Sequence, residues 1–148
     1  MRTSATSATA VRPVLAEHQA LRTALAELKA ALSPRDPHTQ SGPDVVAARL
    51  DVLRGRLATH FAGEERSGLF EQIVGRAPEQ AHTCQSLREE HVAVLRQLDE
   101  LRAFRPEARR APEWGRGVRS LLSVLAAHEA RENELIARVL DGSVGGGD

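Results

Sequence analysis

The sequence predicts an all-α protein with the topology of an up-down-up-down antiparallel four-helix bundle, and three observations support this. Its 148 residues are 41% hydrophobic and 27% charged, a composition typical of one soluble globular domain. Apolar residues recur at alternating steps of three and four, as on a helix, whereas a strand would repeat every two. Prolines and glycines divide the chain into four long segments with short connections, which favour antiparallel neighbours.

The first two helices are bounded by prolines. The first is expected to begin near Pro13 and to cover residues 13–32, because proline is favoured in a first helical turn. It ends at a proline-containing loop. The second is expected to cover residues 43–74, with a bend where Gly63 and Gly68 each weaken the helix by about 1 kcal/mol relative to alanine.

The last two helices are expected at residues 78–104 and 112–140, each again beginning at or next to a proline. The predicted bundle domain therefore covers residues 13–140. We expect residues 1–12 to be a flexible N-terminus and residues 141–148 to be a disordered tail, because the latter is rich in glycine.

Each segment carries one stripe at helical spacing that is expected to face the core. The four stripes are Val11, Val14, His18, Leu21, Leu25, Leu28 and Leu32; Val46, Leu50, Leu53, Leu57, His60 and Glu64; Cys84, Leu87, His91, Val94, Leu98 and Leu101; and Val118, Leu121, Leu125, His128, Glu132, Leu135 and Val139. Such stripes pack against one another in the core of a bundle.

Six polar residues interrupt these apolar stripes: His18, His60, Glu64, His91, His128 and Glu132. A buried carboxylate without a partner costs several kcal/mol, so a compensating charge is expected. His60 with Glu64, and His128 with Glu132, are four residues apart, which places each pair on one helical face about 6 Å apart. At 1.5 Å of rise per residue, all six lie about 16 to 30 Å from the connecting turns and converge on one layer.

The order of these residues repeats, because a lone histidine is followed by H-x-x-x-E in each half of the chain. Four imidazoles and two carboxylates suit a dinuclear metal centre in which each carboxylate bridges both ions and each ion holds two imidazoles. This donor set favours iron, manganese or zinc over calcium or magnesium. Iron is expected if the purpose is redox or dioxygen chemistry. The alternative is a metal-free interaction module in which a His–Glu hydrogen-bond network only sets the helix register.

The residues around these positions resemble a known family. His60-Phe61-Ala62-Gly63-Glu64-Glu65, followed by Leu69-Phe70, is similar to the signature of hemerythrin-like domains, also called HHE cation-binding domains. His128-Glu129-Ala130-Arg131-Glu132 resembles its counterpart on the last helix, and Glu17-His18 and Glu90-His91 fit the single-histidine helices. The resemblance covers about residues 13–140. It implies two iron ions with oxo or hydroxo and carboxylate bridges, and roles in dioxygen binding, oxygen or iron sensing, nitric oxide chemistry or peroxide handling.

Two departures from the oxygen-carrying members change what the resemblance implies. Those proteins have a second histidine one turn before the third-helix ligand, where this chain has Leu87, and usually an aspartate five residues after the last histidine, where this chain has Glu132 at four. We therefore expect reaction with, or sensing of, dioxygen or peroxide rather than transport. Leucines on the stripes are expected to line the cofactor pocket and keep it dry: Leu21, Leu25, Leu57, Leu87 and Leu125.

The remaining polar residues favour no second site. The glutamates beside the predicted ligands, Glu17, Glu65, Glu90 and Glu129, are expected to be solvated surface charges, because adjacent helical residues point about 100° apart. His38 and His82 are predicted to lie on the surface, and Cys84 to be a small buried apolar residue. Trp114 is expected to cover one end of the bundle.

Charge and hydropathy limit the expected partners. With 20 basic and 20 acidic side chains the chain is neutral, which argues against a nucleic-acid partner even though six arginines lie between Arg102 and Arg119. No apolar run approaches the roughly 20 residues of a membrane span, and no secretory signal is apparent. We expect a cytoplasmic monomer whose partners are dioxygen, peroxide or nitric oxide and a redox partner of unknown identity. A ferritin-like oxidase is disfavoured because no E-x-x-H pair lies at the layer.

Overall fold

Helices form nearly all of the described structure. It is a computed structural model that describes residues 5–33, 37–38 and 41–141, with side chains from residue 18 onward. The elements are α1 (Ala5–Leu32), α2 (Pro43–Arg66), α3 (Leu69–Arg76), η1 (Pro78–Gln80), α4 (Ala81–Arg102), η2 (Ala108–Arg110) and α5 (Pro112–Val139). No strand occurs within these ranges, which confirms the all-α prediction. None of the described helices is both long enough and apolar enough to cross a membrane.

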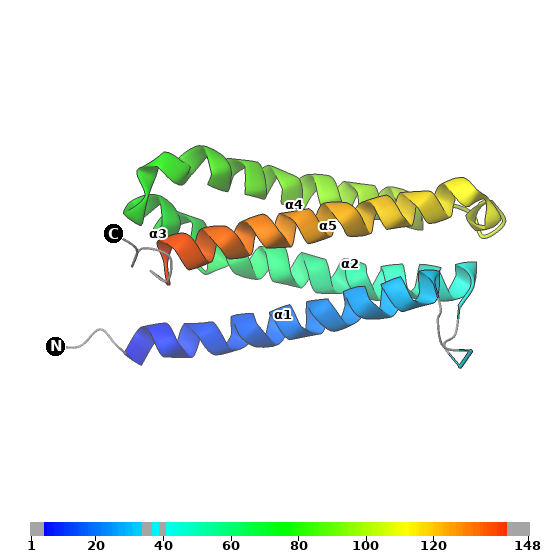
Figure 1. Cartoon of the computed structure of the whole chain (residues 1–148), viewed down its shortest axis with the longest axis horizontal. Helices are drawn as coiled ribbons and strands as arrows, with labels where there is room; N and C mark the ends of the chain where they lie inside the picture. Colours follow the sequence, from blue (N-terminus) through cyan, green and yellow to red (C-terminus); the bar gives the residue numbers. More distant parts are fainter. Residues whose placement is uncertain (1–4, 34–36, 39–40, 142–148) are drawn as a thin grey trace.

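The long helices α1, α2, α4 and α5 lie side by side (Figure 1). The α1–α2 and α4–α5 connections lie at one end of the molecule, on the right of Figure 1. At the other end, α3 and η1 link α2 to α4, and α3 also contacts α4 and α5. Helix α1 packs mainly against α2 and has a smaller contact with α5.

The first helix begins earlier than the sequence indicated. Helix α1 starts at Ala5, not near Pro13, so the expected start was wrong and the segment 1–12 expected to be flexible overlaps the helix. Inside a helix proline removes one backbone hydrogen bond and crowds the carbonyl four residues before it, at a cost of about 3 kcal/mol, yet the helix continues on both sides of Pro13. The alanines in the segment before Pro13 favour helix. Residues 1–4 and 142–148, where we expected flexible ends, lie outside the described residues, as do the side chains of Val11 and Val14.

The expected second helix is divided in two by a break at the second glycine. The Ser67 backbone N–H donates to the Gly63 carbonyl at 2.9 Å, and Gly68 has a left-handed φ of 74°, which glycine adopts without a steric cost. The predicted bend is therefore a full helix end. The new direction places Phe70 and Ile73 of α3 in the protein interior.

The core consists of two apolar clusters separated along the helices. The larger cluster joins α1, α2, α4 and α5 and extends to Leu57, Phe61 and Leu125. The smaller cluster contains Phe70, Ile73, Cys84, Leu87 and Leu135. Every predicted position on the second and third stripes is buried, which confirms those two core assignments.

Glycine 55 offers a direct test of the α2 assignment. The substitution Gly55→Ala is expected to stabilise the protein by about 1 kcal/mol, because alanine favours helix and a Cβ at this position would meet no atom within 4 Å. The melting temperature should rise by about 3 °C. Gly68→Ala is the matched control and should destabilise, since its φ is left-handed. A loss of stability in Gly55→Ala would contradict the helix assignment.

Candidate metal centre

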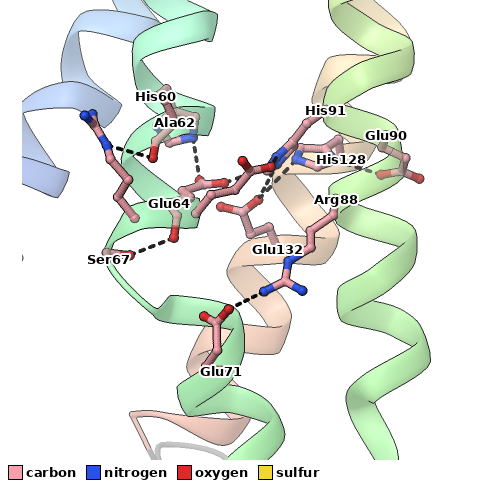
Figure 2. A network of polar contacts seen from close by, with 12 residues as sticks. His60, Ala62, Glu64, Ser67, Glu71, Arg88, Glu90, His91, His128 and Glu132 are labelled. Carbon is pink, nitrogen blue, oxygen red and sulfur yellow. Dashed lines mark hydrogen bonds and ion pairs between the residues drawn. The ribbon is translucent and has the colours of Figure 1, made fainter.

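Five of the six predicted ligands lie buried together between α2, α4 and α5 (Figure 2). They are His60 and Glu64 on α2, His91 on α4, and His128 and Glu132 on α5, each between 1% and 4% exposed. His18 on α1 is half-buried, and its ring centroid lies 4.6 Å from that of His60. The structure therefore brings all six residues into one layer, as the helix spacing predicted.

Each carboxylate faces two imidazoles. Glu64 Oε1 lies 2.7 Å from His60 Nε2, and Glu64 Oε2 lies 3.2 Å from His91 Nε2. Glu132 Oε2 lies 3.1 Å from His128 Nε2 and 3.9 Å from His91 Nε2. Figure 2 shows these side chains pointing toward one another from three helices. The two acids thus link the histidines across the centre of the layer.

These close contacts lack the geometry of hydrogen bonds. Both carboxylate oxygens of Glu64 and of Glu132, both ring nitrogens of His60 and His91, and Nε2 of His128 are buried without a hydrogen-bond partner. Buried polar atoms are almost always paired, so such a concentration of unpaired acceptors and ring nitrogens requires an explanation. Carboxylate oxygens and imidazole nitrogens that lie close together without forming hydrogen bonds are suited to coordinate a shared metal cation.

The donor atoms form two overlapping groups. One atom each from His18, His60, Glu64 and Glu132 lies within 4.8 Å of the others, and so does one atom each from His91, His128 and Glu132. Glu132 belongs to both groups. Imidazole and carboxylate donors in this number fit a transition-metal ion better than calcium or magnesium, so the residues fit the metal that the sequence predicted.

The buried carboxylates control the charge of the histidines. Burial alone lowers the pKa of His60, but the carboxylates of Glu129 and Glu64 outweigh it and raise this pKa to about 10. Burial likewise lowers the pKa of His91, whereas Glu132 and Glu64 raise it to about 9. Without metal, both side chains are therefore positively charged imidazolium groups at neutral pH.

The two acids of the layer respond in opposite directions. Burial raises the pKa of Glu64, and the nearby Glu132 carboxylate acts in the same direction, against the effect of His60 and His91. Burial also acts to raise the pKa of Glu132, but the imidazoles of His128 and His91 outweigh it, so this pKa is lowered. These opposite directions favour the charged form of Glu132 over that of Glu64.

Glu90 supports the layer from α4 and is not the solvated charge that we expected. Its Oε2 lies 2.7 Å from His128 Nδ1 in a hydrogen bond, and its Oε1 accepts from the guanidinium of Arg131. Although burial opposes it, contact with His128 and Arg131 lowers the pKa of Glu90. A carboxylate on Nδ1 holds the proton there and leaves Nε2 free to face the centre.

Glu90→Ala is expected to weaken metal binding about 10- to 100-fold, because His128 would lose the group that sets its tautomer and orientation. Titration with Co²⁺, followed by visible absorption, measures the affinity. Glu89→Ala is the matched control, since this neighbouring residue on α4 contacts Gln85 and not the layer. Equal affinities in the two variants would show that Glu90 has no role in orienting His128.

The other flanking glutamates differ from one another. Glu129 is also not fully solvated, since its Oε1 is buried without a hydrogen-bond partner and lies 3.5 Å from His60 Nε2. Glu65 is half exposed, with Oε1 3.5 Å from His91 Nδ1. The side chain of Glu17 lies outside the described residues. The expectation of solvated charges rested on the angle of about 100° between adjacent helical residues. That angle does not account for the length of a glutamate side chain, which can reach an adjacent helix.

Two phenylalanines pack beside the layer, and neither belonged to the predicted core-facing stripes. Phe61 stacks on His91 with centroids 3.9 Å apart and planes at 9°. Phe70 of α3 lies 6.0 Å from the same ring. The resemblance to the signature already contained both residues, but their ring contacts depend on the tertiary structure.

The leucines predicted to line the pocket lie in the apolar clusters described above. Leu57 is fully buried in the larger cluster and Leu87 in the smaller one, while Leu25 is partly buried against the larger. Their role in keeping the centre dry remains a prediction. Cys84 is buried as expected, and burial raises the pKa of its thiol. His38 and His82 are exposed, also as expected.

Buried histidines and glutamates enclosed by long helices define a helical cation-binding domain. A family model for the hemerythrin HHE cation-binding domain matches residues 9–140, so the chain belongs to that family. This confirms the resemblance found in the sequence. No curated protein and no solved structure matches the chain significantly.

Proposed function

We propose that this protein is a non-haem di-iron protein that reacts with dioxygen or peroxide, or senses oxygen or iron. The observation that carries the proposal is the pair of overlapping donor groups that share Glu132. Four imidazoles and two carboxylates supply enough donors for two ions, and the unpaired state of their buried atoms supports this use.

The distances support a division of ligands between two ions. His18 and His60 would hold one ion, and His91 and His128 the other. Glu132 belongs to both groups, and the two oxygens of Glu64 face histidines from different groups. Both acids would therefore help to hold the two ions. Two iron ions, when bound, would supply the electrons that reduce dioxygen or peroxide.

The protein residues around the ions would control water and protons. The buried apolar side chains of Leu57, Leu87 and Phe61 would exclude water from the layer, which would slow the oxidation of a reduced metal. Glu90 holds a proton at His128 Nδ1. Glu129 places a carboxylate oxygen beside His60, where it can accept or hold a proton.

The proposed topology is an up-down-up-down antiparallel four-helix bundle. It is supported by the position of the α1–α2 and α4–α5 connections at one end and of α3 at the other (Figure 1). In this arrangement α2 contributes ligands from its last two turns, α4 from its middle and α5 from its second half. Rigid helical backbones set the spacing of those ligands.

Anaerobic loading with Fe²⁺ followed by elemental analysis tests the proposal. We expect two irons per chain, and stopped-flow absorption changes on mixing the loaded protein with dioxygen, peroxide or nitric oxide. The relative rates distinguish a sensor from a protein that turns over. Protein that retains no iron after loading would contradict it. In that case His60→Leu with Glu64→Leu should raise the melting temperature, as expected of a metal-free interaction module.

A further inference from the structure

Residues of the α1–α2 and α4–α5 connections form an arginine-lined hollow. Both connections lie at the same end of the molecule (Figure 1). Its volume is about 470 Å³, within the range of small-molecule sites. Four arginines line it, Arg109 and Arg110 from η2 and Arg116 and Arg119 from α5. None of these residues belongs to the metal centre.

The positive charge of this hollow is largely unneutralised. Arg109 donates to the Arg102 carbonyl and Arg119 to the Leu32 carbonyl, each at 3.4 Å, and both acceptors are uncharged. In the part of the chain that the structure describes, only Arg116 of the four forms an ion pair, with Glu113 at 3.5 Å. The Nε of Arg109 is buried without a hydrogen-bond partner. An anion in the hollow would offset the charge of the arginines that have no acidic partner.

Two helix starts add charge of the same sign. Gly42 and Pro43 at the beginning of α2, and Ala111 and Pro112 at the beginning of α5, all line the hollow. Neither helix has a side-chain cap. The first-turn N–H groups of an uncapped helix carry a partial positive charge, so both helix ends favour an anion in the same place as the arginines.

We propose that this hollow binds the phosphate group of a small anionic ligand. Guanidinium groups match phosphate oxygens in charge and in bidentate geometry. Val46 and Leu32 form an apolar wall that would accommodate the non-phosphate part of an organic ester. A nucleic acid fits less well, because Trp114 is buried with its ring N–H donated to the Leu101 carbonyl and offers no stacking face. The proposal does not depend on the metal centre.

The single tryptophan provides a direct measurement. Trp114 lines the hollow and is the chain's only tryptophan, and there is no tyrosine, so intrinsic emission reports this location alone. Titration with pyrophosphate, at constant ionic strength set with chloride, should change the emission saturably and raise the melting temperature. Glucose 6-phosphate forms a second arm. Tighter binding of the sugar phosphate would identify an organic ester as the ligand, and tighter binding of pyrophosphate a free polyphosphate.

The double variant Arg110→Ala, Arg119→Ala should weaken binding at least about tenfold for each arginine removed. Arg56→Ala is the matched control, since Arg56 is an exposed arginine of α2 that does not line the hollow, and it should bind as the unmodified protein does. His128→Ala should also retain binding, which would separate the hollow from the metal centre. Circular dichroism establishes that each variant is folded.

Three results would overturn the proposal. One is the absence of saturable emission or melting-temperature changes with either phosphate. The second is undiminished binding in the double arginine variant. The third is an equal stabilisation by chloride, which would mean that salt only screens the arginines. A single-stranded oligonucleotide that binds where pyrophosphate does not would assign the surface to nucleic acid instead.

Discussion

Glu132→Gln is expected to abolish tight binding of the two proposed metal ions, because this carboxylate belongs to both donor groups. Glutamine keeps the size of the side chain and removes its charge. Loss of a group that only hydrogen-bonds to a metal ligand lowers metal affinity about 10- to 100-fold. Loss of a shared anionic ligand should therefore lower it at least about 100-fold at each ion. Elemental analysis after dialysis and Co²⁺ titration measure the loss.

His18→Ala is the comparison that makes this result specific. His18 belongs to one donor group only and is the half-buried member of the layer, so we expect this variant to retain one ion per chain. Glu134→Gln, at an exposed position on the same helix, should retain two. Two ions bound to Glu132→Gln with unchanged affinity would disprove the sharing of that carboxylate.

Metal loading at pH 7 is expected to release at least two protons per chain, because the pKa values of His60, His91 and His128 are all raised. In the metal-free protein the pKa of His60 is about 10 and that of His91 is about 9, so both are protonated at pH 7. Metals bind neutral imidazole and must displace these protons. Apparent affinity should therefore rise with pH, by up to about tenfold per unit for each proton, until about pH 9. A pH-indicator dye in a weakly buffered solution measures the number of protons released.

The stability of the metal-free protein should change in the opposite direction. An unfolded histidine has a pKa of about 6.5, so the raised folded values mean that each imidazolium stabilises the fold fully below that pH. This stability is lost as the pH rises through about 9 to 10. Urea unfolding in the presence of a chelator should show a decrease on the order of several kcal/mol between pH 7 and pH 10.

His82→Ala is the control for both pH experiments, since this exposed histidine lies outside the layer. It should leave the proton count and the stability profile of the metal-free protein unchanged. A metal-free protein whose stability is constant across this range, together with metal binding that releases no protons, would show that the buried carboxylates do not hold the histidines in the charged form.

The six-residue layer could be predicted because helical spacing alone decides which side chains share a face. His60 and Glu64, and His128 and Glu132, are four residues apart on stripes that are otherwise apolar, so their burial followed from the periodicity. The break at Gly68 could be predicted only as a bend, because the intrinsic cost of glycine does not reveal whether the chain resumes in a new direction.

Contacts between helices could not be predicted in this way. Glu90 and Glu129 are not part of the stripes of their own helices. Glu90 of α4 reaches His128 of α5, and Glu129 of α5 reaches His60 of α2. Both contacts depend on the rotation and offset of one helix against its neighbour. The stacking of Phe61 on His91 depends on the same rotation. The charge of the arginine-lined hollow likewise depends on two connections meeting at one end.

The amino-acid sequence by itself determined the helical class, the buried stripes and the six residues of the layer, because a backbone period of 3.6 residues orders side chains within one helix. The tertiary structure alone decided which ligand atoms belong to the same donor group and which carboxylate contacts which imidazole. These depend on the rotation and axial offset of one helix against another, which result from packing over the whole core and not from the spacing of residues along any one helix.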